Sequence, residues 1–390
     1  MKLLFKGNWG LILEENNVYK NQRRFALHAL KDHGFAKTEF EPFIVGEALR
    51  AIEQSIEECE ENGECDMCSG NVINQLVFGH TTEDKNKLMS LKMTLQELFS
   101  DWFHPRWLLL EALPWIRHLE KIGIDYGINR ASKVNNRFLT FLENEIAEHQ
   151  KTFDPSSPPR DFVDAFLIEM NKLPNGEKSN EFNMWQLTIA CYDLWSAALE
   201  TTVCTLQHAV LFLLQHPEIQ EKLHAEIDNV VGRDHHLSSK DQSKLPYLSA
   251  FIQEVHRLTN VIPLSLPHET LEDTIIEGYR IPKGTTVMAQ LACVNLDPNE
   301  YDRPEKCIPE RHIDPAGKLI KEDRLHPFSI GRRSCLGEGL ARPEIFLILG
   351  TLLQKCQIQP TEVGKPPKTE SVPGLVKSIK QFSCRFVKIT

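Results

Sequence analysis

The feature that constrains this chain most is a long stretch, residues 181–216, that is apolar on nearly every side of a helix. Its sequence is EFNMWQLTIACYDLWSAALETTVCTLQHAVLFLLQH. A helix without a polar face must be buried along most of its length. We therefore expect a fold in which other elements pack around one central helix.

Shorter helices and a small β-rich region are predicted on both sides of this stretch. Apolar residues at helical spacing, with Gly or Pro near the ends, predict the helices. Sequence rich in β-formers with Gly and Pro turns predicts strands at 273–291 and near 375–390. We expect a single domain over residues 1–390, mainly α with a small β portion. The predicted helices are 19–34, 42–63, 132–154, a short helix from residue 160, 216–232, 245–260 and 337–356.

Composition narrows the class of protein. Lys and Arg number 44 and Asp and Glu 54, so the net charge of −10 argues against a nucleic-acid binder. Ten scattered cysteines fit a reducing compartment with free thiols. The opening MKLLFKGNWGLIL is interrupted by Lys6 and Gly7 and does not resemble a signal peptide. No run reaches the roughly 18 apolar residues of a spanning helix, so no transmembrane segment is predicted.

The segment FSIGRRSCLG, residues 328–337, places Cys335 just before the last predicted helix. Free N–H groups and the positive end of the helix dipole favour an anion there, and Arg333 adds a cation. The loop therefore favours a thiolate, which acts as a nucleophile or as a metal ligand. A single thiolate suits haem, whose equatorial ligands come from the macrocycle. The alternative is an inert structural cysteine at a helix start.

The same segment matches a ten-residue pattern, F-x-x-G-x-R-x-C-x-G, at Phe328, Gly331, Arg333, Cys335 and Gly337. This pattern resembles the haem-binding signature of the cytochrome P-450 family. The resemblance implies the cytochrome P-450 fold, with Cys335 as the axial ligand of the iron in heme b and Phe328 beside the cofactor.

Two further motifs carry the resemblance. The family pattern A-G-x-[DE]-T corresponds to AALET, residues 197–201, in the long helix. It implies that Ala197 borders the haem and that Glu200 and Thr201 deliver protons to dioxygen. The alternative is a solvent-facing helix side that carries Asp193 and Glu200. The family also implies a buried, structural cluster of Glu254 and Arg257, from EVHR, with Arg311, from PERH.

The resemblance extends to the groups that hold the haem propionates. It implies that Arg23, in a helix resembling W-x-x-x-R, and Arg333 bind them, with His268 as a further partner. Tyr19 takes the place of the tryptophan. The candidate substrate-pocket residues are all apolar: Leu194, Ala197, Val261 to Leu264, and Val376.

The resemblance is to the microsomal family-two type. It implies a haem-thiolate monooxygenase that inserts one atom of O2 into a small lipophilic substrate, such as a xenobiotic, fatty acid or steroid-like molecule. Electrons would come from NADPH through a cytochrome reductase, with cytochrome b5 as a further candidate partner. The implied location is the cytoplasmic face of the endoplasmic reticulum membrane, with peripheral membrane contact. The candidate docking patch for the reductase is basic: Lys20, Arg24, Lys31 and Arg332.

Several departures leave an alternative open. Ala198 replaces a glycine, Cys307 replaces an aromatic residue, and Pro343 lies within the last helix. The match begins near residue 8, so we expect an N-terminally truncated member without the membrane anchor and first strands. The alternative function is a non-catalytic remnant with weak or no haem binding. A zinc site at Cys65 and Cys68 and a membrane-facing segment at 102–116 are alternatives for those stretches.

Overall fold

The structure is a computed structural model. It describes residues 5, 7–61, 70–81, 85–102, 109, 113, 115–116, 118, 128–172, 181–362, 364–372 and 374–389. The cysteine pair at 65–68 and most of segment 102–116 lie outside the described residues, so the hypotheses about them stay untested.

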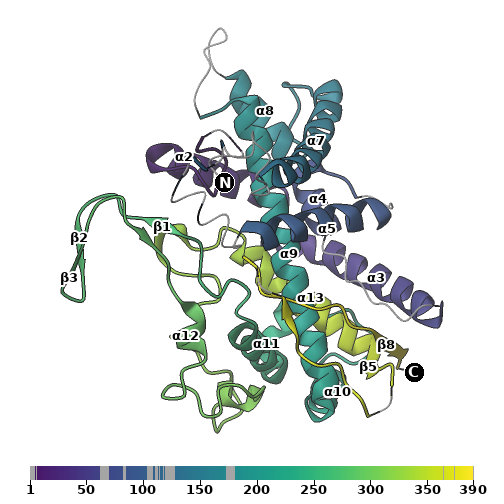
Figure 1. The fold of residues 1–390 in the computed structure, drawn as a ribbon. Helices are drawn as coiled ribbons and strands as arrows, with labels where there is room; N and C mark the ends of the chain where they lie inside the picture. Colours follow the sequence, from purple (N-terminus) through teal and green to yellow (C-terminus); the bar gives the residue numbers. More distant parts are fainter. Residues whose placement is uncertain are drawn as a thin grey trace.

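The predicted central helix is α9, Met184–Gln215, and it runs through the middle of the molecule (Figure 1). The side chain of Asn183 caps its first turn by accepting the N–H of Gln186 at 2.9 Å. By length and composition α9 could cross a membrane, but most of its apolar stretch is buried inside the molecule. It is therefore the core helix that the sequence predicts.

The other helices pack around α9 in two groups. One group contacts its first half and includes two helices, α4 and α5, that the sequence patterns above do not predict. The second group contacts its C-terminal half (Figure 1). The first group and its neighbours are α2 (Asn16–Asp32), α3 (Glu41–Glu61), α4 (Gly70–Phe78), α5 (Lys85–Trp102), α7 (Ile128–Thr152) and α8 (Phe162–Asn171); the second is α10 (Pro217–Val230), α11 (Pro246–Thr259) and α13 (Glu338–Lys355).

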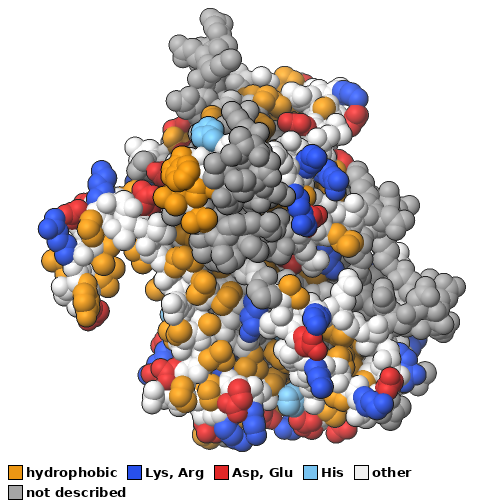
Figure 2. Space-filling model, in the orientation of Figure 1, with side chains coloured by type: hydrophobic (Ala, Val, Ile, Leu, Met, Phe, Trp, Pro, Cys, Tyr) orange, Lys and Arg blue, Asp and Glu red, His pale blue; other side chains and the backbone are white. Residues whose placement is uncertain are grey.

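Strands in the described residues form two-stranded antiparallel sheets: β1–β4, β2–β3, β5–β8 and β6–β7. The β2–β3 hairpin turns at Glu277 and Gly278, both with positive φ, and projects from the body (Figure 1). Its apolar side chains Ile275, Ile276 and Tyr279 are exposed, as Figure 2 shows on the projecting arm. The strands are β1 (His268–Glu269), β2 (Thr274–Ile276), β3 (Tyr279–Ile281), β4 (Thr286–Val287), β5 (Cys356–Pro360), β6 (Ser371–Val372), β7 (Ser378–Ile379) and β8 (Cys384–Lys388).

Short helical turns join these elements. Pro343 lies inside α13, beyond the first turn, as the sequence predicts. The remaining short elements are η1 (Thr38–Phe40), η4 (Ser239–Lys244), α12 (Leu291–Asn295), η5 (Pro309–His312) and η6 (Gly331–Arg333).

Candidate functional site

The loop that carries Cys335 is a tight turn between η6 and the start of α13. Gly331 adopts φ +82°, a conformation that glycine tolerates best, and the Cys335 N–H donates to the carbonyl of Phe328 at 2.8 Å. The Phe328 ring packs edge-on against His256 and under the guanidinium of Arg342. The loop is thereby fixed with Cys335 partly open to solvent.

The pKa of the Cys335 thiol is set by opposing effects. Although part of Cys335 is open, burial of its surroundings raises the pKa of the thiol. The N–H groups of Gly337 and Glu338 oppose this rise, and the nearby cation that does so is Arg23. Without bound iron, desolvation opposes the thiolate, and the expectation that Arg333 and the helix end favour the charged form stays a prediction.

Three of the predicted propionate-binding residues come together beside this loop. The Arg333 guanidinium lies 3.4 Å from the centre of the Tyr19 ring. The Tyr19 hydroxyl donates to the Arg332 carbonyl at 2.8 Å, and Arg23 Nη1 donates to that hydroxyl at 3.3 Å. His268 lies apart from them in β1, exposed and paired with Val287. Whether it contacts a propionate stays a prediction.

Helix α9 exposes one short stretch, at the positions that the sequence singles out. Ala197 is exposed and Ala198 and Thr201 are half-buried, while the residues before and after them are buried. The Thr201 hydroxyl donates to the Ala197 carbonyl at 2.6 Å, which turns it back onto the helix. The stretch is a small, apolar surface that carries one hydroxyl.

Glu200, the neighbour of Thr201, faces the interior. It is 2% exposed, so the alternative of a solvent-facing side is wrong. Burial raises the pKa of its carboxyl, while Gln96 and Ser378, each donating at 3.3 Å to Oε1, and the charge of Lys92 oppose the rise. Gln96 and Ser378 belong to no sequence motif of the site, and they lie more than 100 residues from Glu200 along the chain.

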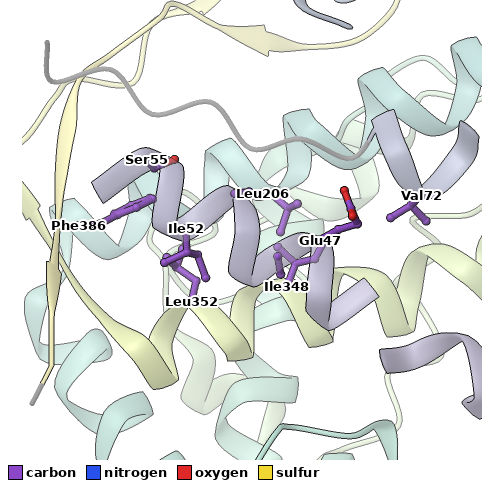
Figure 3. A pocket seen from close by; sticks show the side chains of 10 residues that line it. Glu47, Ile52, Ser55, Val72, Leu206, Ile348, Leu352 and Phe386 are labelled. Atoms are coloured by element: carbon purple, nitrogen blue, oxygen red, sulfur yellow. The ribbon is translucent and has the colours of Figure 1, made fainter. Parts of the chain in front are cut away.

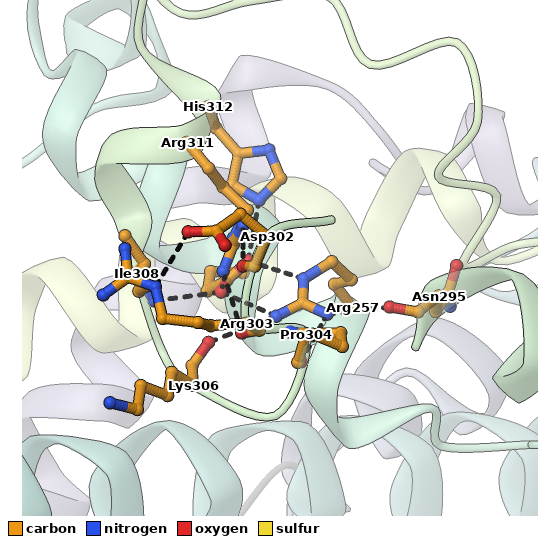
Figure 4. A network of polar contacts seen from close by, with 10 residues as sticks. Arg257, Asn295, Asp302, Arg303, Pro304, Lys306, Ile308, Arg311 and His312 are labelled. Carbon is orange, nitrogen blue, oxygen red and sulfur yellow. Dashed lines mark hydrogen bonds and ion pairs between the residues drawn. The ribbon is translucent and has the colours of Figure 1, made fainter. Parts of the chain in front are cut away.

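The predicted cluster of Glu254, Arg257 and Arg311 is present and buried (Figure 4). Arg257 donates twice to Glu254, at 2.8 Å each, and Arg311 Nε donates at 3.0 Å. His312, which the sequence motifs do not predict as a member, is fully buried, with Nε2 at 2.9 Å from Glu254 Oε2. Burial favours the neutral acid, but the donors from Arg257 and His312 outweigh it and lower the pKa of Glu254 to about 2.

The candidate pocket residues meet only in part. Val376 lies in a small cluster with Phe99 and Cys204, against which Val261 and Ile262 pack. Leu194 instead belongs to the main core. A separate, largely apolar cavity lined from α3, α4, α9, α13 and β8 contains none of the predicted site residues (Figure 3).

These residues fit a haem held by one thiolate. Cys335 has no His or carboxylate beside it that would complete a multi-ligand metal site in the described part of the chain. The group that comes closest to such a site is His149, Asp161 and Asp164, but Asp161 caps α8 and contacts His149, while Asp164 pairs with Arg160. A single sulfur can be the axial ligand of haem iron, and the two guanidiniums beside it can pair with anionic groups such as the haem propionates.

Comparisons with known proteins agree with this geometry. A family model described as Cytochrome P450 matches residues 3–386. The chain is 35% identical to Probable cytochrome P450 CYP36A1 of Caenorhabditis elegans, over 99% of this chain and 79% of that protein. It is 35% identical to Cytochrome P450 2E1 of Oryctolagus cuniculus, over 90% and 71%. It is 34% identical to Cytochrome P450 2D26 of Mus musculus, over 86% and 67%.

Proposed function

Because the chain belongs to the cytochrome P450 family of haem-thiolate monooxygenases, we propose that it oxidises a small lipophilic molecule with electrons passed from NADPH by a flavoprotein reductase. The observation that carries this proposal is the position of Cys335, partly open at a fixed turn with two backbone N–H groups near its sulfur. When bound, haem supplies the activation of dioxygen and the oxidation of the substrate.

The chain's own residues would hold the cofactor and manage protons. Cys335 would bind the iron, which supplies the charge stabilisation that the loop lacks. Arg23 and Arg333 would pair with the propionates. Glu200, with its raised pKa, would hold a proton in the interior and pass it to Thr201, with Ser378 and Gln96 keeping its carboxyl oriented.

The substrate would lie against the exposed stretch of α9 and the cluster around Val376. Ala197, Val261, Ile262 and Val376 offer no charge or hydrogen-bond donor, which favours an apolar ligand. This supports the lipophilic substrate class, and residence at the endoplasmic reticulum membrane, where such molecules concentrate, is part of the proposal.

The ligand role of Cys335 is tested by the spectrum of the reduced, haem-loaded chain with carbon monoxide. We expect a red-shifted Soret band in the wild type and its loss in Cys335→Ser, with Cys293→Ser, another exposed cysteine, as the matched control. If the wild type gives no such band, the chain is better described as a non-catalytic member of the family. If the band survives in Cys335→Ser, another ligand holds the iron.

The reductase would dock on the exposed basic residues beside the cysteine loop: Lys20, Arg24, Lys31 and Arg332. Opposite charges steer such encounters and fix their orientation. Reversal of Lys20 and Arg24 to Glu should slow reduction by the reductase at least tenfold at low salt, measured by stopped flow. Reversal of Lys151, exposed on α7, is the control, and equal rates in the two variants would contradict this docking site.

A further inference from the structure

Residues 10–14, here called the strap, form an irregular turn between α9 and the cysteine loop. The N–H groups of Gly10, Leu11 and Ile12 donate hydrogen bonds to side chains of α9. Gln186 both accepts the Gly10 N–H, at 3.0 Å, and donates to its carbonyl, at 3.1 Å. Asp193 Oδ2 accepts the N–H groups of Leu11 and Ile12, at 2.6 and 2.9 Å. Gly10 adopts φ +78°, and a Cβ there would overlap Asp193 Oδ2, so only glycine lets the strap approach this closely.

The carbonyl groups of the strap accept hydrogen bonds from the cysteine loop. Arg333 donates to the carbonyls of Leu11 and Ile12, at 3.5 Å each, and to that of Glu14. Two residues further along, the loop carries Cys335. One continuous set of hydrogen bonds thus runs from α9, which bears Thr201, through the strap to the loop that bears the sulfur.

We propose that Asp193 is a positioning residue for the Cys335 loop: it fixes the strap, and the strap fixes Arg333 and the turn that follows. The significance of this role for catalysis rests on the proposed function. Asp193 is 3% exposed, and no cation of the described residues compensates its charge; the nearby titratable group is the phenol of Tyr192. A buried carboxylate without a cation is costly to keep, so its two backbone contacts are the interactions that offset this cost.

Hydrogen exchange of the full chain, read by mass spectrometry, tests the first half of the proposal without haem. The variants are Asp193→Leu and the milder Asp193→Asn, which guards against a failure to fold. The matched control is Thr188→Val, since Thr188 is buried on the same helix and bonds only within it. We expect exchange at least tenfold faster in the strap and also in residues 331–337, where Ser334 and Cys335 donate N–H bonds to Gly331 and Phe328. The control should match the wild type.

Acceleration in the strap without acceleration in residues 331–337 would overturn the proposal, and so would no change in either segment. Because exchange needs no haem, this result can be read even if the chain proves not to bind it. The second half is tested on the haem-loaded protein. Both Asp193 variants should lose at least half of the red-shifted carbon monoxide band that reports the thiolate, and Thr188→Val should keep it. A band of full intensity in both Asp193 variants would also overturn the proposal.

Discussion

Two buried carboxylates, Glu254 on α11 and Asp193 on α9, have opposite electrostatics. Both are almost fully buried, and burial alone would raise both pKa values. Glu254 receives donors from two arginines and a histidine, and its pKa falls to about 2. Asp193 receives only two backbone N–H groups, and its pKa rises to about 7.

The difference follows from the donors: hydrogen bonds from Arg257 and His312, together with the charge of Arg257, lower the pKa of Glu254, whereas the pKa of Asp193 is lowered by two backbone N–H groups alone. Glu344 on α13 makes the same point, because burial raises its pKa to about 8 with no compensating cation. Buried acids that pair with a cation are structural, whereas buried ionisable groups without a cation hold a proton or need a metal to supply positive charge.

The largest loss of stability should come from removing the ionised carboxylate of Glu254. Glu254→Ala leaves the fully buried Arg257 without its carboxylate, and removing one partner of such a pair costs about 3–5 kcal/mol of unfolding free energy. Urea unfolding measures the loss. Glu254→Gln, which keeps the volume, serves if the alanine variant does not fold. Glu310→Ala, in which a surface pair with Lys222 and a hydrogen bond from the Tyr247 hydroxyl are lost, should cost less, about 1–2 kcal/mol. Equal losses at Glu254 and Glu310 would contradict the comparison.

The pH dependence of stability should separate the two carboxylates next. Asp193 has a pKa of about 7 in the folded chain and of about 3.9 unfolded, so the native state binds more protons between these values. Stability from this group therefore falls as pH rises from about 4 to 7, by about 4 kcal/mol at most. Glu254, with its lowered pKa, contributes stability above about 4.3 that is lost only as pH falls toward 2.

Urea unfolding at pH 5.5 and 8 checks this. Between the two pH values, the unfolding free energy of the wild type should fall by about 2 kcal/mol relative to that of Asp193→Asn. The reason is that the change in pH crosses about half of the range over which Asp193 affects stability. Glu254→Gln, whose window lies below pH 5, should differ from the wild type by the same amount at both. A constant difference between Asp193→Asn and the wild type would show that the Asp193 carboxyl titrates normally.

The parts of the site that could be predicted from the sequence lie within short motifs. Cys335 with its turn, Glu254 with Arg257, and Ala197 with Thr201 are each fixed by spacing along one helix or one loop. The helices with strong apolar periodicity, such as 245–260, are likewise found close to their predicted bounds. Such local patterns depend on backbone geometry alone.

The parts that could not be predicted depend on contacts between distant segments. Asp193 meets Leu11 across 182 residues, and Gln96 meets Glu200 across 104. The pKa of the Cys335 thiol could not be predicted for a related reason: the helix end and Arg333 are visible in the sequence, but desolvation depends on what packs around the sulfur. The contact between His312 and Glu254 could not be predicted either, because nothing in the sequence PERH indicates that its histidine faces a carboxylate.

The smallest loss of stability should come from changing His312, one of the donors to the ionised Glu254. Because an ionised Glu254 can only accept, the proton of His312 sits on Nε2, and Nδ1 is left buried without a partner. His312→Leu removes one of several donors and should cost about 1–2 kcal/mol of unfolding free energy. His312→Gln, which can keep an N–H toward Glu254, should cost less, and His236→Leu, on an exposed site, should have no measurable effect. If His312→Leu is as stable as the wild type, the two arginines alone keep Glu254 ionised, and the histidine only fills space.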